Sequence, residues 1–234
     1  MARRGLAPSR EIAQRLIMAG RVRVNSQPAA KPDLRVTEDS EIIVLAGAPE
    51  YASRGAHKLI AALEHFSINV EGRRALDVGA STGGFTDVLL ARGAAHVIAL
   101  DVGYGQIIER LRVDTRVTVL DRRNIRTVTP AELPYAPDLV TIDASFISLK
   151  LVLPAALALA TPKAEVIALI KPQFEVGKGK VGKGGIVRDA ATRLAAVAAI
   201  VDFARGLGLA VSPAFESPLA GAKGNLEYLA HMRR

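Results

Sequence analysis

The sequence contains no cysteine and no tryptophan, and aromatic residues make up 4% of its 234 positions. The absence of cysteine excludes disulfide bonds and thiolate metal sites, and four histidines without ligand spacing predict no metal centre. The longest apolar run, LVLPAALALA at 151–160, is too short to span a bilayer. No apolar segment of signal-peptide length follows the basic N-terminus. We therefore expect a cytoplasmic protein that does not contact a membrane.

Positive charge is in excess, with a formal net charge of +8 and a pI near 10.0. Half of the residues are hydrophobic, which is enough to build a globular core. The length allows one α/β domain with a small additional module. A basic surplus suits an anionic partner, and nucleic acid is the first expectation, ahead of an anionic membrane.

The chain divides into a basic module at 1–47, a linker at 48–57 and a larger domain at 58–234. In the module, SREIAQRLIMAG is typical of a helix with Ser9 as its N-cap and Gly20 as its end, and RVRVN and EIIVL are typical of strands. In the larger domain, strand-like and helical segments alternate. This predicts an α/β fold with a mostly parallel, Rossmann-like sheet covered on both faces, and the short last connection predicts an antiparallel final hairpin.

The stretch LDVGASTGGFTDVLL predicts a strand, a glycine turn and a helix that together bind a cofactor. Ser81 occupies the position of the middle glycine in a dinucleotide fingerprint, so S-adenosylmethionine is favoured over a nicotinamide or flavin. Asp101 ends the second strand and could accept from ribose hydroxyls, and Asp121 follows the third and could accept from the adenine amine. A tight turn with solvated acids is the alternative. The residues expected to hold the cofactor are Asp77, Gly79, Ala80, Ser81, Thr82, Gly83, Gly84, Phe85, Asp101 and Asp121.

Two charged residues end the fourth and fifth predicted strands. Asp143 follows VTI, and Lys171 follows the apolar run VIALI. A lysine is costly to bury at such a position unless it is paired or functional. The pattern therefore predicts either a catalytic pair in the crevice or a structural ion pair.

Six ordered motifs carry a family resemblance: YASRGAHKL, LDVGASTGGFTDVLL, LDVGYGQ, TIDASFISL, LIKPQFEVG and GNLEYL. Together they resemble the TlyA (haemolysin-A-like) RNA methyltransferases, relatives of the FtsJ-type ribose 2′-O-methyltransferases. The resemblance implies an S-adenosylmethionine-dependent methyltransferase domain. The basic first part of the chain resembles an RNA-binding module that is named after a ribosomal small-subunit protein. The family usually has a further helical segment before RRGLAPSR, so we expect the module to be N-terminally short.

The resemblance also implies a catalytic set of two lysines, an aspartate and a glutamate. Matched motif by motif, these are Lys58, Asp143, Lys171 and Glu227. The implied activity is ribose 2′-O-methylation of ribosomal RNA or ribosomal subunits, with cytidine as the expected nucleotide. Two roles fit Lys171, that of a base for the 2′-hydroxyl and that of a charged group that orients it.

RNA contacts are expected from the basic module, from the linker and from the glycine- and lysine-rich loop at 176–185. The residues concerned are Arg4, Ser9, Arg10, Arg15, Arg21, Arg23, Arg54, Lys178, Lys180 and Lys183. Three other functions remain alternatives: a ribosome-assembly factor that binds RNA without catalysis, a membrane-active haemolysin, and a nicotinamide oxidoreductase.

Overall fold

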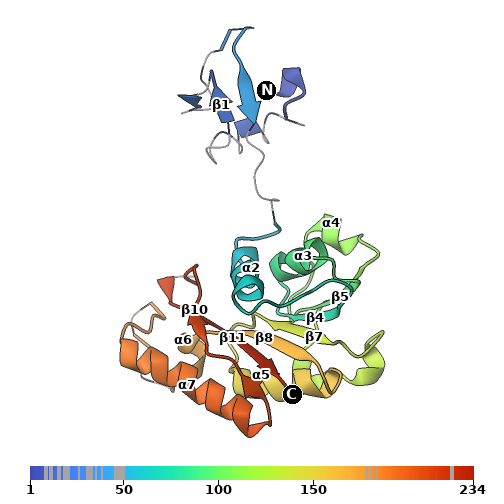
Figure 1. Ribbon diagram of the computed structural model, residues 1–234, viewed down its shortest axis with the longest axis vertical. Coiled ribbons are helices and arrows are strands. Elements are labelled where there is room, and N and C mark those ends of the chain that lie inside the picture. The colour runs from blue at the N-terminus through green and yellow to red at the C-terminus, as the bar shows by residue number, and fades with distance from the viewer. Residues whose placement is uncertain are drawn as a thin grey trace. The chain divides into compact units, whose positions relative to one another are not determined.

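The computed structural model describes residues 1–7, 10, 13–14, 17, 22–25, 27–29, 34, 36–37, 39–44, 51–177, 179, 181–182, 184–221 and 224–234. The chain folds into two compact units, Met1–Glu50 and Tyr51–Arg234, and each is described by itself (Figure 1). Within the residues just named, no helix is both long enough and apolar enough to cross a membrane.

The first unit contains a three-stranded antiparallel sheet in the order β2-β1-β3. Its elements are η1 (Ala2–Arg4), β1 (Val22–Val24), β2 (Gln27–Pro28) and β3 (Ile42–Val44). Asn25 turns the chain between β1 and β2 with a left-handed φ of 48°, a conformation that asparagine adopts more readily than most residues. The strands predicted at RVRVN and EIIVL are present, whereas the helix predicted to begin at Ser9 lies largely outside the described residues.

The second unit contains an eight-stranded sheet in the order β10-β11-β8-β7-β4-β5-β6, with β9 paired to β11. Its strands are β4 (Arg74–Val78), β5 (His96–Leu100), β6 (Val117–Leu120), β7 (Leu139–Ile142), β8 (Glu165–Ile170), β9 (Ala210–Val211), β10 (Phe215–Glu216) and β11 (Tyr228–Arg233). Strands β4 to β8 are parallel, and β11 runs antiparallel to β8. The predicted mostly parallel sheet with an antiparallel last strand is confirmed.

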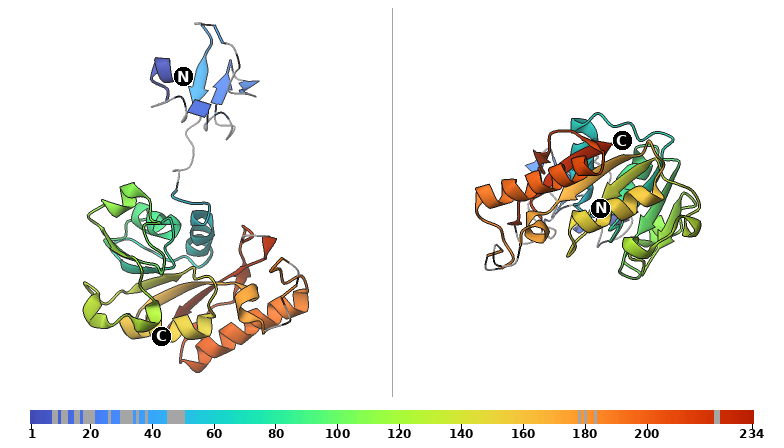
Figure 2. Two further views of the ribbon diagram at one scale, coloured as in Figure 1. Left: turned by 180° about the vertical axis from the view of Figure 1, so that it is seen from behind. Right: turned by 90° about the horizontal axis from the view of Figure 1, so that it is seen from below.

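Helices cover both faces of this sheet, as the alternating pattern predicts. They are α2 (Ala56–His65), α3 (Gly84–Ala91), α4 (Glu109–Arg112), α5 (Leu149–Leu159), α6 (Pro172–Glu175) and α7 (Ala190–Gly206), with the short 3₁₀ turns η2 (Ile125–Thr127) and η3 (Pro130–Glu132). Helices α2 and α3 pack on one face, and α5 and α7 pack on the other (Figures 1 and 2).

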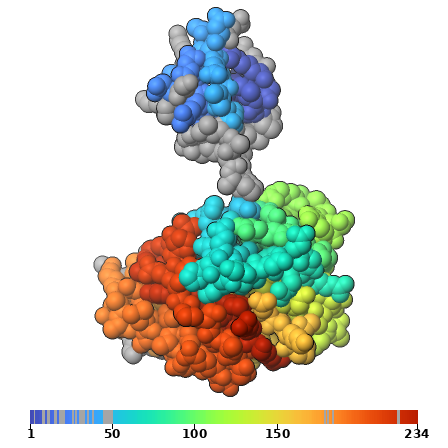
Figure 3. Space-filling model, in the orientation of Figure 1, coloured from blue at the N-terminus to red at the C-terminus, as the bar shows by residue number. Residues whose placement is uncertain are grey.

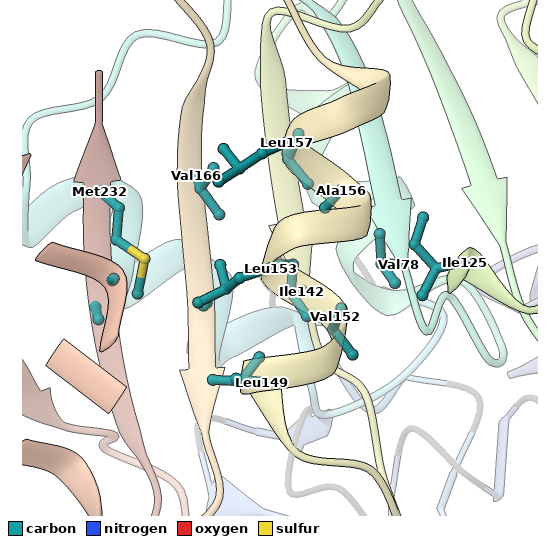
Figure 4. Close-up of a cluster of buried hydrophobic side chains, with 14 of the residues drawn as sticks. Val78, Ile125, Ile142, Leu149, Val152, Leu153, Ala156, Leu157, Val166 and Met232 are labelled. Carbon is teal, nitrogen blue, oxygen red and sulfur yellow. The ribbon is translucent and has the colours of Figure 1, made fainter. Parts of the chain in front are cut away.

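The apolar stripe of α5 forms the centre of one core (Figure 4). Val152, Leu153 and Ala156 are completely buried on this stripe, and they face Ile142 of β7 and Val166 of β8. Burying one such leucine contributes roughly 2 kcal/mol. This packing holds the loop before α5 at the carboxyl edge of the sheet.

The parallel strands β4, β5, β7 and β8 end at one edge, because every crossover returns the chain to the opposite edge. The residues that directly follow them are Gly79, Asp101, Asp143 and Lys171. Ligands of open α/β sheets bind at this edge, so the fold gathers the predicted site residues where a ligand is expected.

Candidate active site

The glycine turn brings the end of β4 against the end of β7. Gly79 has a φ of 85°, and a Cβ there would lie 2.7 Å from the carbonyl oxygen of Asp143. Only glycine allows both the left-handed backbone and this close approach. The turn then continues through Ser81, which is also left-handed, into Gly83, the N-cap of α3.

A cavity of about 570 Å³ opens beside this turn. It is lined by Val78, Gly79, Ser81, Leu100, Asp101, Val102, Gln106, Asn124, Ile125, Asp143, Ala144, Ser145, Phe146, Ile147 and Val152. A second hollow of about 330 Å³ is lined by Ser53, Arg54, Gly55, Gly79, Ala80, Ser81, Thr82, Gly84, Phe85 and Asp143. The two spaces share Gly79, Ser81 and Asp143, so they adjoin at the tips of β4 and β7.

The carboxylate of Asp101 lies at the wall of the larger cavity, and two backbone hydrogen bonds fix its orientation. Its Oδ2 accepts the backbone N–H of Ser81 at 2.8 Å, and its Oδ1 accepts the N–H of Gly103 at 2.7 Å. These bonds fix the carboxylate without burying it completely. It can therefore accept further hydrogen bonds from a ligand in the cavity.

Asp77 has a supporting position, although the sequence suggests a cofactor contact. It is completely buried, and its two oxygens accept the hydroxyls of Thr86 at 2.7 Å and Thr141 at 3.0 Å. Burial, together with the nearby charge of Asp143, raises the pKa of Asp77 to about 6, against the lowering effect of the two hydroxyls. The side chain ties β4 to α3 and β7 beneath the glycine turn.

The structure does not bring Asp121 to either hollow. Its Oδ2 accepts the N–H of Gly105 at 3.1 Å and lies 3.2 Å from the guanidinium of Arg112. The expected contact of Asp121 with adenine stays a prediction. Asn124 and Ile125, in the segment that follows Asp121, line the larger cavity. Gly83 also lines neither hollow, because it packs against the side chains of Leu111 and Ile107.

The predicted catalytic set forms two ion pairs, and the pair between Lys58 and Glu227 is the more deeply buried one. Lys58 lies on α2 and Glu227 directly precedes β11, and their Nζ and Oε2 atoms are 2.5 Å apart. The side chains are 9% and 3% exposed. Figure 3 shows the cyan surface of α2 beside the red C-terminal residues. A buried charge of either sign costs several kcal/mol unless it is paired, so each residue requires the other.

Lys171 and Asp143 form the second pair, with Nζ 2.7 Å from Oδ1. Lys171 also donates to Ser145 Oγ at 2.7 Å and lies 3.5 Å from the backbone oxygen of Asp143. Because Tyr228 on β11 pairs with Ile170 on β8, the register places Glu227 beside Lys171. The four residues of the predicted catalytic set thus occupy neighbouring strand ends and α2, and of the four only Asp143 lines the two hollows.

Gly221 lies so close to the Glu227 side chain that only a glycine fits at this position. A side chain at Gly221 would overlap the Glu227 carboxylate. On the other side, Gln173 Nε2 lies 3.5 Å from Glu227 Oε1. Glu227 is therefore confined by three separate segments of the chain.

Phe146 is a further candidate that the sequence does not single out. Its side chain is 91% exposed at the rim of the cavity, and its backbone is left-handed with φ 64°. A large exposed aromatic in a strained conformation is uncommon, and such residues cluster at functional sites. The only sequence signal is an aromatic three residues after the strand-end Asp143, which periodicity cannot distinguish from a core residue.

The predicted RNA contacts are only partly described. Arg10, Arg23 and Arg54 are exposed, and Arg4 donates to the carbonyl oxygens of Ser40 at 2.7 Å and Thr37 at 2.8 Å. The remaining members, Ser9, Arg15, Arg21, Lys178, Lys180 and Lys183, lie outside the described residues. No cluster of metal-ligating side chains occurs in the described part of the chain.

Comparison with known families matches both units. Residues 51–234 match the FtsJ-like methyltransferase family, and residues 1–42 match the S4 domain. The first match covers more than half of the chain. It includes the glycine turn and all four members of the predicted catalytic set.

Individual relatives extend over the full length. The chain is 51% identical to the Mycobacterium tuberculosis protein named 16S/23S rRNA (cytidine-2′-O)-methyltransferase TlyA, over 100% of this chain and 87% of that protein. It is 39% identical to Hemolysin A of Brachyspira hyodysenteriae, over 97% of this chain and 95% of the relative. A solved structure from Streptococcus thermophilus, described as a hemolysin, superposes with a TM-score of 0.78 at 39% identity, covering 97% and 83% of the two chains.

Proposed function

This chain belongs to the TlyA family of FtsJ-like methyltransferases, and from that membership we propose that it methylates a ribose 2′-hydroxyl of ribosomal RNA with S-adenosylmethionine. The name of the M. tuberculosis relative makes cytidine the expected nucleotide. The observation that carries the proposal is that two ion pairs, Lys58–Glu227 and Lys171–Asp143, lie at neighbouring strand ends, where Asp143 also lines the cavity. Such a substrate places the enzyme with ribosomes in the cytoplasm.

The larger cavity fits the adenosine part of the donor. Its volume of about 570 Å³ lies within the usual range of small-molecule sites. Asp101 offers a fixed carboxylate to the ribose hydroxyls, Leu100 and Ile125 offer apolar surface to the adenine, and the Asn124 amide lies beside them. The adjoining hollow leaves room for the amino-acid end of the donor.

When bound, S-adenosylmethionine supplies an electrophilic methyl group on a positively charged sulfur. The protein must bring the 2′-oxygen in line with that carbon and accept the hydroxyl proton. Lys171 Nζ donates one hydrogen bond at 2.7 Å, to Ser145 Oγ, and lies 2.7 Å from Asp143 Oδ1 as an ion pair, so a hydrogen remains with which it can hold the hydroxyl oxygen. The hydroxyl proton passes to the Asp143 carboxylate, which lies beside the Lys171 ammonium. Lys58 and Glu227 hold the ribose beside it.

Two features support RNA as the substrate. The ring of Phe146 is exposed beside the catalytic set, and an exposed aromatic ring provides a stacking surface for a base that has left its helix. The S4-matching unit presents Arg10 and Arg23 to solvent, and exposed arginines bind phosphates.

The test is to incubate the protein with purified small and large ribosomal subunits and donor carrying a radioactive methyl group. We expect label in the RNA of at least one subunit and none with Lys171→Ala. The Lys171→Ala protein should still bind S-adenosylhomocysteine, measured by calorimetry. Absence of label with both subunits, despite donor binding, would favour an RNA-binding factor without catalysis.

A further inference from the structure

Glu175 joins the two loops that carry Asp143 and Lys171. It is the last residue of α6, four positions after Lys171. Its Oε2 accepts the hydroxyl of Ser148 at 2.6 Å, and its Oε1 accepts the backbone N–H of Leu149 at 2.8 Å. Ser148 and Leu149 begin α5, at the far end of the loop that starts with Asp143. Both carboxylate oxygens are thus used to fasten one loop to the other.

The Glu175 carboxylate lies at the N-terminus of α5, which explains why an acidic residue suits this position. The first N–H groups of a helix have no partner within the helix, and a negative charge is favourable beside them. Ser148 caps α5 only towards Lys150, at 3.2 Å, so Glu175 supplies the acceptor that Leu149 lacks. Burial raises the pKa of Glu175, and the hydrogen bonds from Leu149 and Ser148 oppose that rise.

The loop from 143 to 149 is held under strain between its two ends. Phe146 adopts a left-handed φ of 64°, which is a strained conformation for a residue with a side chain. Near the catalytic end, Ser145 accepts from Lys171 at 2.7 Å. In the middle, the rings of Phe146 and Phe174 are 5.1 Å apart. A strained loop of this kind keeps its shape only while its ends are fixed.

We propose that Glu175 is a positioning residue for methyl transfer, which acts by fixing the loop from 143 to 149 against α6. Through that loop it sets the place of Ser145, a hydrogen-bond partner of Lys171, and the outward direction of Phe146. The inference rests on the proposed function. Glu175 lines neither hollow, and both of its carboxylate oxygens accept hydrogen bonds from the start of α5, so its role is to hold the loop.

The test compares Glu175→Ala with Glu175→Gln and with a capping control elsewhere. Asp189 is the control, because it caps α7 by accepting the Thr192 N–H at 2.7 Å and lies outside both hollows. Asp189→Ala removes a helix cap of the same kind. For each full-length variant we would measure the melting temperature, the Kd of S-adenosylhomocysteine, and kcat and KM for ribosomal subunits.

Glu175→Ala should lower kcat on the order of tenfold to a hundredfold, as for a small displacement of reacting groups, while KM changes by less than about threefold. Glu175→Gln should restore kcat to within about threefold of wild type, since its amide oxygen still accepts from Leu149. Asp189→Ala should keep the wild-type kcat although its melting temperature falls.

Three results would overturn the inference: a Glu175→Ala enzyme within twofold of the wild-type kcat, a Glu175→Gln enzyme as impaired as Glu175→Ala, or an equal loss in Asp189→Ala. If Glu175→Ala does not fold, Ser148→Ala removes one of the two bonds and should still lower kcat severalfold, and an unchanged kcat there counts against the proposal. Wild-type protein that labels no subunit contradicts the proposed function, whereas an active Glu175→Ala enzyme contradicts only this inference.

Discussion

Individual residues at the strand ends differ in what they can do, even where the sequence treats them alike. Asp77, Asp101 and Asp121 each follow or end a strand. Only Asp101 reaches the cavity, because Asp77 is enclosed by two threonines and Asp121 is paired with Arg112. The sequence predicts the acids but not their directions, since those depend on neighbours far along the chain.

Asp101→Ala should weaken the binding of S-adenosylhomocysteine by about 1–3 kcal/mol, because the ribose hydroxyls lose a charged acceptor. The matched control is Asp121→Ala, at the corresponding place after the next strand. It should weaken binding much less, because Asp121 lines neither hollow. Calorimetry on both variants decides this, and equal losses would mean that Asp121 also reaches the donor.

Asp77 predicts a pH dependence of stability. Its pKa is about 6 in the folded protein against an ordinary 3.8. Between about pH 4 and 6 the folded state therefore keeps a proton that the unfolded chain has released, so the free energy of unfolding falls as pH rises through that window. The fall approaches about 3 kcal/mol and ends above pH 6.

Asp77→Asn removes this titration. Denaturant unfolding of both proteins from pH 4.5 to 7 should show the variant gaining stability relative to wild type as pH rises. Two parallel stability curves would contradict the raised pKa.

At the level of elements, the long helices and parallel strands are predictable because their periodicities are regular. Residues 209–217 contain two short strands, β9 and β10, which are both paired to β11. The predicted catalytic set depends on a contact between α2 and the residue before β11, because Lys58 and Glu227 are 169 positions apart. No local pattern encodes such a contact, and the family resemblance alone indicated it. Phe146 escaped prediction because its exposure follows from the strained loop before α5.

Gly221→Ala tests the confinement of Glu227. The added methyl group would overlap the carboxylate and should displace it from Lys58, with a loss of kcat of at least tenfold. Gly206→Ala is the matched control, because a side chain there meets nothing within 4 Å, and it should keep full activity. If Gly221→Ala also kept full activity, the Lys58–Glu227 pair would not need its present geometry.

On the scale of the whole molecule, the chain combines a methyltransferase domain with an S4-matching unit. We propose a division of labour in which the first unit binds RNA phosphates and the second binds the donor and carries out the transfer. The boundaries of the module at 1–47, the linker at 48–57 and the domain at 58–234 stay predictions. The separate roles of the two units can be tested by removing positive charge from each of them.

Replacing Arg10 and Arg23 with glutamine should weaken RNA binding and flatten its salt dependence, by up to about 0.9 in the log–log slope for each phosphate that the protein no longer neutralises. Donor affinity should not change. Arg92→Gln with Arg205→Gln, which removes the same charge from the C-cap of α3 and from α7, serves as the control and should leave the slope unchanged. Equal slopes for all three proteins would assign RNA binding elsewhere.

The central claim is that the methyl group goes to a ribose 2′-hydroxyl under the control of Lys171, and alkaline hydrolysis of the product tests it most directly. Cleavage of RNA in alkali needs a free 2′-hydroxyl, so ribose methylation removes one band from the ladder. We predict a single gap in RNA treated with wild-type enzyme and an unbroken ladder with Lys171→Ala or Lys171→Arg, because guanidinium differs from ammonium in reach and stays protonated. Labelled RNA that gives an unbroken ladder with wild-type enzyme, or a gap that persists with Lys171→Ala, would contradict the account.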